Sequence, residues 1–185
     1  IMMLIPVMFI CELYRKSPTP IANIGSTLMG IVYVAMPLAL LFFIPLLLGR
    51  GVWNPWALIF YIFIIWANDV CAYLVGMSIG KHRLFQRISP KKSWEGFIGG
   101  LVGAMVMGYV ASTFMEGTHA IWIGMALIAA ITGVFGDLVE SLLKRSVDVK
   151  DSGNILPGHG GWLDRFDALL LSIPFVFIYL VFCID

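Results

Sequence analysis

Long apolar runs, separated by short charged or glycine-rich segments, make up most of this sequence. A helix needs about 20 consecutive apolar residues to cross the hydrocarbon core of a bilayer. On that basis the pattern predicts an all-α fold, a polytopic transmembrane helical bundle of about six spans with the first one partial. The predicted spans are 1–13, 22–48, 55–79, 95–114, 120–143 and 166–184.

Three local features refine this prediction. The chain begins inside an apolar run, IMMLIPVMFI, so we expect residues 1–185 to be a single transmembrane domain, the C-terminal portion of a longer chain. Pro37 and Pro45 should kink the second span, which membrane helices tolerate better than soluble ones. The span 95–114 carries five glycines, and small residues at four-residue spacing favour close packing on a neighbouring helix.

Composition supports a membrane protein. Hydrophobic residues make up 60% of the 185 residues and charged residues only 12%, and the mean hydropathy is +0.94. Ordinary soluble domains carry about a quarter charged residues. The sequence therefore predicts an integral membrane protein whose charges are confined to a few segments.

The basic residues lie almost entirely on one side of the predicted bundle. The loops 14–21, 80–94 and 144–165 hold eleven of the twelve Lys and Arg residues, and only Arg50 lies on the opposite side. Cytoplasmic loops of membrane proteins carry an excess of Lys and Arg. We therefore expect these three loops to face the cytoplasm.

The segment from Ser141 to Asp167, SLLKRSVDVKDSGNILPGHGGWLDRFD, concentrates charge between two apolar runs. Charge at a membrane boundary is costly unless it pairs, binds an ion or meets a charged substrate. The glycines and prolines of this segment exclude a continuous helix and leave backbone amides free to approach an anion. Carboxylates, cations and a glycine-rich turn together favour metal-dependent phosphate chemistry.

Two groups of acidic residues flank this turn. Asp137, Glu140 and Lys144 share one face of the fifth predicted span, because they are spaced i, i+3, i+7. An intramembrane carboxylate such as Asp137 usually marks a functional site, although Glu140 and Lys144 alone could form a solvated ion pair. Asp164 and Asp167 follow the turn, where one of them could simply cap a helix.

A third polar group spans residues 68–96. Asp69 lies deep inside an apolar helix, and a basic loop with Ser89, Lys91 and Lys92 follows it. Free amides and two cations at a helix start suit a triphosphate, although such a loop could also anchor anionic lipid head groups. A GxxxxGK[ST] loop is absent from the sequence, which excludes a P-loop enzyme.

These residues resemble a known family. The pattern S-x-x-K-R-x4-K-D-x-G-x3-P-G-H-G-G-x2-D-R-x-D at Ser141–Asp167 is similar to the signature of phosphatidate cytidylyltransferases, and the segment Ala72–Gly100 is similar to a second block of that family. Val70 and Cys71 depart from the family pattern after Asp69. The short connection at 115–119 looks more like bacterial members than eukaryotic ones.

The resemblance implies that CTP and phosphatidic acid react to give CDP-diacylglycerol and pyrophosphate. It also implies Mg²⁺, with a second metal ion as an option. The expected metal ligands are Asp137 and Asp164. The expected catalytic residues are Lys144, Arg145, Asp148, Lys150, His159 and Asp167. The expected substrate-binding residues are Asp69, Ser89, Lys91, Lys92, Glu95 and Arg165.

The expected partners are CTP, phosphatidic acid and the lipid bilayer, with a homodimer as an option and no nucleic acid. The expected location is a bacterial inner membrane, with the site on the cytoplasmic side. Two alternatives stay open. A related enzyme could use CTP on an isoprenoid lipid, as a kinase or a cytidylyltransferase. An ion-coupled transporter could use Asp69 and Asp137 as an ion pathway.

Overall fold

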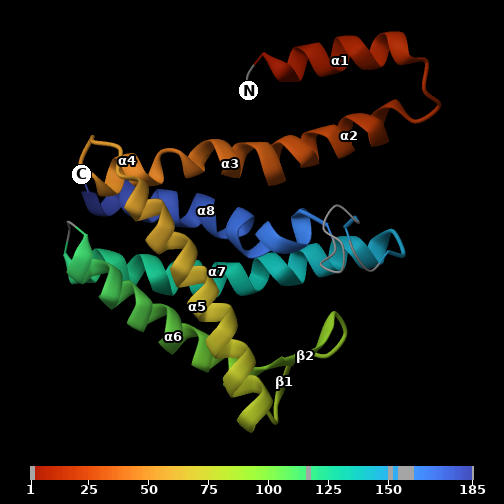
Figure 1. The fold of residues 1–185 in the computed structure, drawn as a ribbon. Helices are drawn as coiled ribbons and strands as arrows, with labels where there is room; N and C mark the ends of the chain where they lie inside the picture. The colour runs from red at the N-terminus through yellow and green to blue at the C-terminus, as the bar shows by residue number, and fades with distance from the viewer. Residues whose placement is uncertain (1–2, 116–117, 150–151, 154–160, 185) are drawn as a thin grey trace.

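A computed structural model describes residues 3–115, 118–149, 152–153 and 161–184. Within these ranges the chain is almost entirely helical (Figure 1). The elements are α1 (Leu4–Arg15), α2 (Pro20–Gly30), the π-helical segment η1 (Ile31–Ala35), α3 (Met36–Leu41), α4 (Ile44–Leu48), α5 (Pro55–Ile79), β1 (Arg83–Phe85), β2 (Ser89–Ser93), α6 (Trp94–Phe114), α7 (His119–Ser146) and α8 (Leu163–Ile184).

The predicted transmembrane bundle is confirmed, with one addition. Five helical stretches of the described residues are long and apolar enough to cross a membrane. They are Pro20–Leu48, Pro55–Ile79, Trp94–Phe114, His119–Ser146 and Leu163–Ile184. The predicted partial span corresponds to α1, which has 12 residues and packs on α2. The addition is an antiparallel hairpin of β1 and β2 inside the basic loop between α5 and α6.

The second span is broken at its two prolines, as predicted. Pro37 has no N–H to donate, and the ring of a proline crowds the carbonyl four residues earlier, which here belongs to Tyr33. The helix widens around Tyr33 into η1, where the Met36 N–H donates to the carbonyl of Ile31. Pro45 lies in the first turn of α4, directly after the break at residues 42–43.

Glycines set the distance between α5 and α6, as their spacing predicted. A Cβ on Gly96 would lie 2.7 Å from the carbonyl oxygen of Ala72, and one on Gly100 would lie 2.6 Å from Oδ1 of Asn68. Ser93 begins α6 by accepting a hydrogen bond from the Gly96 N–H at 3.2 Å. This close packing fixes the β1–β2 hairpin, which is continuous with α6, beside the end of α5.

The core lies between α5, α7 and α8. Trp122, Met125 and Ala129 of α7 are fully buried with Ile173 of α8. The Tyr61 hydroxyl of α5 and the Ser172 hydroxyl of α8 form a buried hydrogen bond of 2.6 Å. α7 and α8 run side by side in Figure 1, and α2 to α4 extend along α8 on the side away from the hairpin.

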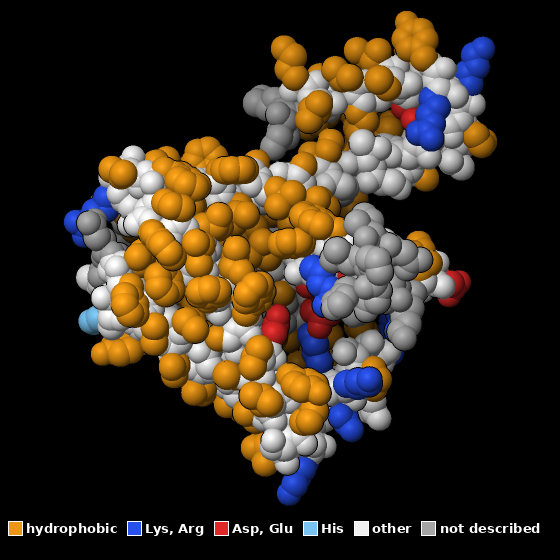
Figure 2. All heavy atoms as spheres, in the orientation of Figure 1, with side chains coloured by type: hydrophobic (Ala, Val, Ile, Leu, Met, Phe, Trp, Pro, Cys, Tyr) orange, Lys and Arg blue, Asp and Glu red, His pale blue; other side chains and the backbone are white. Residues whose placement is uncertain are grey.

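The outer surface is mainly apolar. Many large hydrophobic side chains are exposed, and Figure 2 shows them over most of the visible face. An apolar outer surface of this extent suits contact with lipid. The connections α1–α2, α5–α6 and α7–α8 lie at one end of the bundle in Figure 1, and α4–α5 and α6–α7 lie at the other, as the predicted topology requires.

Gly136 controls the approach of α8 to α7. A Cβ on Gly136 would lie 2.5 Å from the carbonyl oxygen of Asp167, whereas one on Gly133 would meet Ala168 at ordinary van der Waals distances of 3.5 Å or more. Gly136→Ala should therefore destabilise the protein by about 1–3 kcal/mol, the usual cost of overpacking. Gly133→Ala is the matched control and should leave stability nearly unchanged. Thermal unfolding in detergent measures both, and equal midpoints would contradict the close approach.

Candidate functional site

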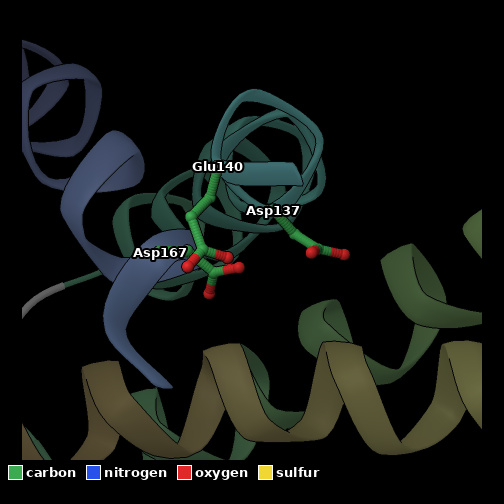
Figure 3. A group of neighbouring side chains, drawn as sticks. All are labelled: Asp137, Glu140 and Asp167. Atoms are coloured by element: carbon green, nitrogen blue, oxygen red, sulfur yellow. The ribbon is translucent and has the colours of Figure 1, made fainter. Parts of the chain in front are cut away.

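Three carboxylates from two helices meet at one place in the bundle. Asp137 and Glu140 lie on α7, and Asp167 lies on α8 (Figure 3). One oxygen from each lies within 4.8 Å of the others. Glu140 is only 1% exposed and Asp167 only 8%. We call Asp137, Glu140 and Asp167 the carboxylate cluster.

The local sequence explains why these side chains converge. The i, i+3 spacing puts Asp137 and Glu140 on one face of α7. Gly136 allows the backbone of α8 at Asp167 to pack directly against α7. One carboxylate oxygen of Asp167 accepts a hydrogen bond of 2.7 Å from the Ala168 N–H, which orients the side chain. The cluster therefore depends on a close helix–helix contact as well as on its acidic residues.

Two lysines lie against the cluster. Lys92 of β2 forms an ion pair with Asp137 and donates to the Val134 carbonyl at 3.5 Å. Lys144 of α7 is 3.0 Å from Glu140 and 2.6 Å from Asp164. The ion pair between Glu140 and Lys144 that the sequence left open is thus present, but it is shared with Asp164. Asp137, Glu140 and Asp164 share these two ammonium groups, so negative charge remains at the site.

One oxygen of the cluster lacks a partner. Oε1 of Glu140 is buried, and no hydrogen-bond donor contacts it among the described residues. A buried carboxylate oxygen without a donor is costly, and a divalent cation would supply the missing contact. Carboxylate oxygens are the ligands that Mg²⁺ prefers. The residues therefore fit a divalent cation, by their donor chemistry, their spacing and their remaining charge.

Asp164, predicted as a metal ligand, lies next to the cluster. Its Oδ1 contacts Lys144, and its Oδ2 accepts hydrogen bonds from the Ser152 N–H at 2.9 Å, the Ser152 hydroxyl at 2.8 Å and the Gly161 N–H at 2.7 Å. Asp164 therefore ties the turn after α7 to Lys144. Metal binding by Asp164 stays a prediction, whereas Asp137 does lie in the cluster.

The predicted nucleotide-binding loop is the β1–β2 hairpin. Ser89 is half-buried and Lys91 is exposed, whereas Lys92 points to the cluster through its ion pair with Asp137. Glu95 accepts hydrogen bonds from the backbone N–H groups of Lys81 and His82 at 3.1–3.3 Å and contacts the His82 ring at 2.7 Å. Glu95 thus holds the hairpin on α6, and its contact with substrate stays a prediction.

Asp69 of α5 faces the same region. Lys92 and Asp137 are its charged neighbours, and the Asn68 side-chain amide donates to its Oδ1 at 3.4 Å. Asn68 is itself buried, with its Oδ1 unpartnered among the described residues. The structure therefore brings Asp69, Lys92 and Asp137 into one electrostatic neighbourhood.

Three further predicted residues lie outward from the cluster. Arg145, Asp148 and Arg165 are exposed. Asp148 follows the last turn of α7 with a positive φ of 55°. Lys150 and His159 lie outside the described residues. The roles of these five residues in catalysis or binding stay predictions.

Two residues near the cluster were not predicted from the sequence. Ser152 binds Asp164 through its N–H and its hydroxyl. Tyr33 of η1 has a buried hydroxyl without a partner among the described residues, and Asp167, Glu140 and Asp137 are its charged neighbours. The only sequence signal for Tyr33 is Pro37, four residues later, which predicts a distorted turn around Tyr33 without showing what that turn faces.

Comparison with known proteins agrees with the resemblance seen in the sequence. The family described as "Cytidylyltransferase family" matches residues 1–183. The chain belongs to the cytidylyltransferase family. A phosphatidate cytidylyltransferase of Bacillus subtilis (strain 168) is 50% identical over 120 residues, covering 63% of this chain and 44% of the relative. One of Staphylococcus aureus (strain COL) is 48% identical over 120 residues, covering 64% and 46%.

A third relative, the phosphatidate cytidylyltransferase of Staphylococcus saprophyticus, is 43% identical over 126 residues, covering 67% of this chain and 48% of the relative. The chain spans about half the length of the curated relatives it matches. Membership of the family, expected from the motif at Ser141–Asp167, and the similarity to bacterial members, expected from the short connection at 115–119, are confirmed.

Divalent-cation binding tests the cluster directly. Glu140→Gln and Asp167→Asn should each lower the affinity for Mn²⁺ at least tenfold, since loss even of an outer partner of a metal ligand costs about 10–100-fold. Asp164→Asn should have a smaller effect if Asp164 mainly anchors the turn, and an equal one if it is a ligand. Electron paramagnetic resonance of Mn²⁺ with the purified protein measures these affinities.

Glu12→Gln is the control, because Glu12 lies on α1 and contacts Asn23 rather than the cluster. Wild-type Mn²⁺ affinity in Glu140→Gln would remove the carboxylate cluster as a cation site.

Proposed function

We propose that this chain carries the catalytic part of a membrane phosphatidate cytidylyltransferase, which converts CTP and phosphatidic acid to CDP-diacylglycerol and pyrophosphate. The observation that carries the proposal is the carboxylate cluster, set between a basic hairpin and a glycine-rich turn in an apolar bundle. The similar Bacillus and Staphylococcus proteins are named phosphatidate cytidylyltransferases, which supports the same reaction.

The reaction joins two anions. An oxygen of the phosphatidate phosphomonoester attacks the α-phosphorus of CTP, and the bond from that phosphorus to the bridging oxygen of the β-phosphate breaks, so that pyrophosphate leaves. The nucleophile is already anionic near neutral pH and needs no general base. The main barrier is charge crowding around the phosphorus, which catalysis relieves by electrostatic stabilisation and positioning.

We propose Mg²⁺ as the cation, held by Asp137, Glu140 and Asp167, with Asp164 as the ligand expected from the sequence and a second ion as an option. When bound, Mg²⁺ would neutralise phosphate oxygens and orient them for in-line attack. Lys144 lies between Glu140 and Asp164, so its charge can meet phosphate oxygens bound at the cluster.

The two lysines of the hairpin take different parts in this proposal. Lys92 already contacts Asp137, so it would neutralise a phosphate bound at the cluster. Lys91 is exposed beside Ser89 and suits capture of the CTP triphosphate from solution. Arg145, Arg165 and Lys150 would add positive charge on the same side, and Asp148 and His159 complete the predicted set around the turn. The homodimer expected from the resemblance stays a prediction.

Product formation by the purified full-length protein tests the function. Phosphatidate in mixed micelles should give CDP-diacylglycerol and pyrophosphate only with CTP and a divalent cation, and a chelator should abolish turnover. Glu140→Gln should lower turnover at least about 100-fold, because removal of a preorganised charge that stabilises the transition state costs about 10²–10³.

Other outcomes would point elsewhere. Reaction of an isoprenoid alcohol or its phosphate in place of phosphatidate would favour a related lipid enzyme that uses CTP. Ion flux into vesicles without CTP turnover would favour a transporter. Absence of CTP-dependent product with every lipid acceptor would contradict a cytidylyltransferase.

We also propose that the site faces the cytoplasm of a bacterial cell, from the inner membrane. The loops that carry eleven of the twelve basic residues lie at the end of the bundle that holds the hairpin and the turn. Cytoplasmic CTP would then reach the cluster directly.

Cysteine labelling tests this orientation. In a background without Cys11, Cys71 and Cys183, which are free, Lys91→Cys and Gly153→Cys should react with an impermeant reagent only from the cytoplasm. Val52→Cys, exposed between α4 and α5, should react only from the other side. Labelling of positions 91 and 153 from opposite sides would break the single-site arrangement, since both loops must reach one CTP.

A further inference from the structure

Tyr33 occupies the one π-helical turn among the described residues. Pro37 removes the N–H that would bond the Tyr33 carbonyl, and the Met36 N–H donates instead to Ile31, five residues earlier. Single π turns inside α-helices are frequent at functional sites, because they re-aim side chains. The π turn loses regular α-helical hydrogen bonds. None of the η1 residues is buried, so core packing does not compensate for this loss.

The Tyr33 hydroxyl has no partner although it lies near several acceptors. It is buried, and no described group within hydrogen-bond distance meets it. Its charged neighbours are Asp167, Glu140, Asp137 and Lys144. Oε1 of Glu140 also lacks a partner among the described residues. An unpartnered donor near an acceptor-rich cluster with an unpartnered oxygen is what a bound group could join.

A phosphate bound to a cation suits these groups. Its oxygens would ligate a cation at the carboxylate cluster and accept a hydrogen bond from Tyr33. A phenolic hydroxyl is also a suitable donor beside acidic groups, since it stays neutral near pH 7.

The side of the cluster on which Tyr33 lies indicates which substrate it would contact. Lys92 and the hairpin lie on one side of α7 and α8, and α2 to α4 lie on the other in Figure 1. Val32 and Met36, next to Tyr33 along the chain, are exposed apolar residues suited to lipid contact. Figure 2 shows acidic and basic side chains gathered in a hollow of the mainly apolar face. The Tyr33 side of the cluster therefore borders on hydrocarbon.

We propose that Tyr33 binds the lipid substrate, by donating a hydrogen bond from its hydroxyl to the phosphomonoester of phosphatidate at the carboxylate cluster. This inference rests on the proposed function, and it assigns the two sides of the site to different substrates. The hairpin side receives the nucleotide, and the η1 side receives the lipid phosphate. The hydroxyl orients the attacking oxygen and leaves the cation to the carboxylates.

Tyr33→Phe tests this assignment with the loss of a single oxygen. A hydrogen bond to a charged group is worth about 1.5–3 kcal/mol, or roughly 10–100-fold. The KM for phosphatidate in mixed micelles should therefore rise about tenfold or more, while the KM for CTP changes less than about twofold. The Mn²⁺ affinity should stay at the wild-type value. Tyr179→Phe is the matched control, because its hydroxyl donates to the Ala120 carbonyl on α7 and not to the carboxylate cluster.

Binding without turnover separates this inference from the proposed function. Phosphatidate binding with Mg²⁺ and without CTP should weaken about tenfold in Tyr33→Phe and stay unchanged in Tyr179→Phe. A wild-type protein that binds phosphatidate through Tyr33 but makes no CDP-diacylglycerol would refute the function and keep the inference. Thermal stability without lipid should not fall in Tyr33→Phe, because the lost hydroxyl has no partner, whereas a structural role would lower it.

Three results would overturn the inference. Wild-type affinity for phosphatidate in Tyr33→Phe would show that the hydroxyl does not contact the lipid. An equal rise in the KM for CTP would place the hydroxyl at the nucleotide. A lower Mn²⁺ affinity would make Tyr33 a partner of the metal ligands.

Discussion

Repulsion among three carboxylates held close together is the constraint on which the rest of the site depends. Asp137, Glu140 and Asp167 bring oxygens within 4.8 Å of one another, and each like-charge pair at this range costs roughly 3 kcal/mol at an effective dielectric constant of about 20. Glu140 and Asp167 are also withdrawn from water. Such an arrangement is stable only with positive charge nearby, and each neighbouring element supplies some of it or orients it.

The lysines offset only part of the negative charge of the carboxylates. Lys92 neutralises the Asp137 end, and Lys144 is divided between Glu140 and Asp164. The turn holds Asp164 through Ser152 and Gly161, so Lys144 cannot leave Glu140 freely. Negative charge remains, and a divalent cation would offset it. Such a site would attract a cation, as proposed, and would keep lysines close to bound phosphates.

Much of this arrangement follows from the sequence, because helical periodicity and hydropathy act locally. The span 55–79 was predicted with the bounds that α5 has, and the spacing of Asp137 and Glu140 predicted a shared face. The hairpin was not predicted, since Ser89–Ser93 is a short polar segment without alternation. The sequence also did not predict that Glu140 belongs to the cluster or that Ser152 and Tyr33 lie near it. Only tertiary contacts decide which side chains reach Asp167 and Asp164.

Tyr33 illustrates how a local rule acquires a function through packing. Pro37 alone predicts a kink, and a kink can face lipid, protein or solvent with equal local consequences. Here η1 contacts α8, which carries Asp167, so the widened turn directs a hydroxyl toward a cluster that already holds excess negative charge. The Tyr33 hydroxyl is a neutral donor, so it leaves the net charge of the site unchanged. It restricts which oxygen of a bound phosphate can face the cation, and that restriction matters most for the substrate whose oxygen must attack.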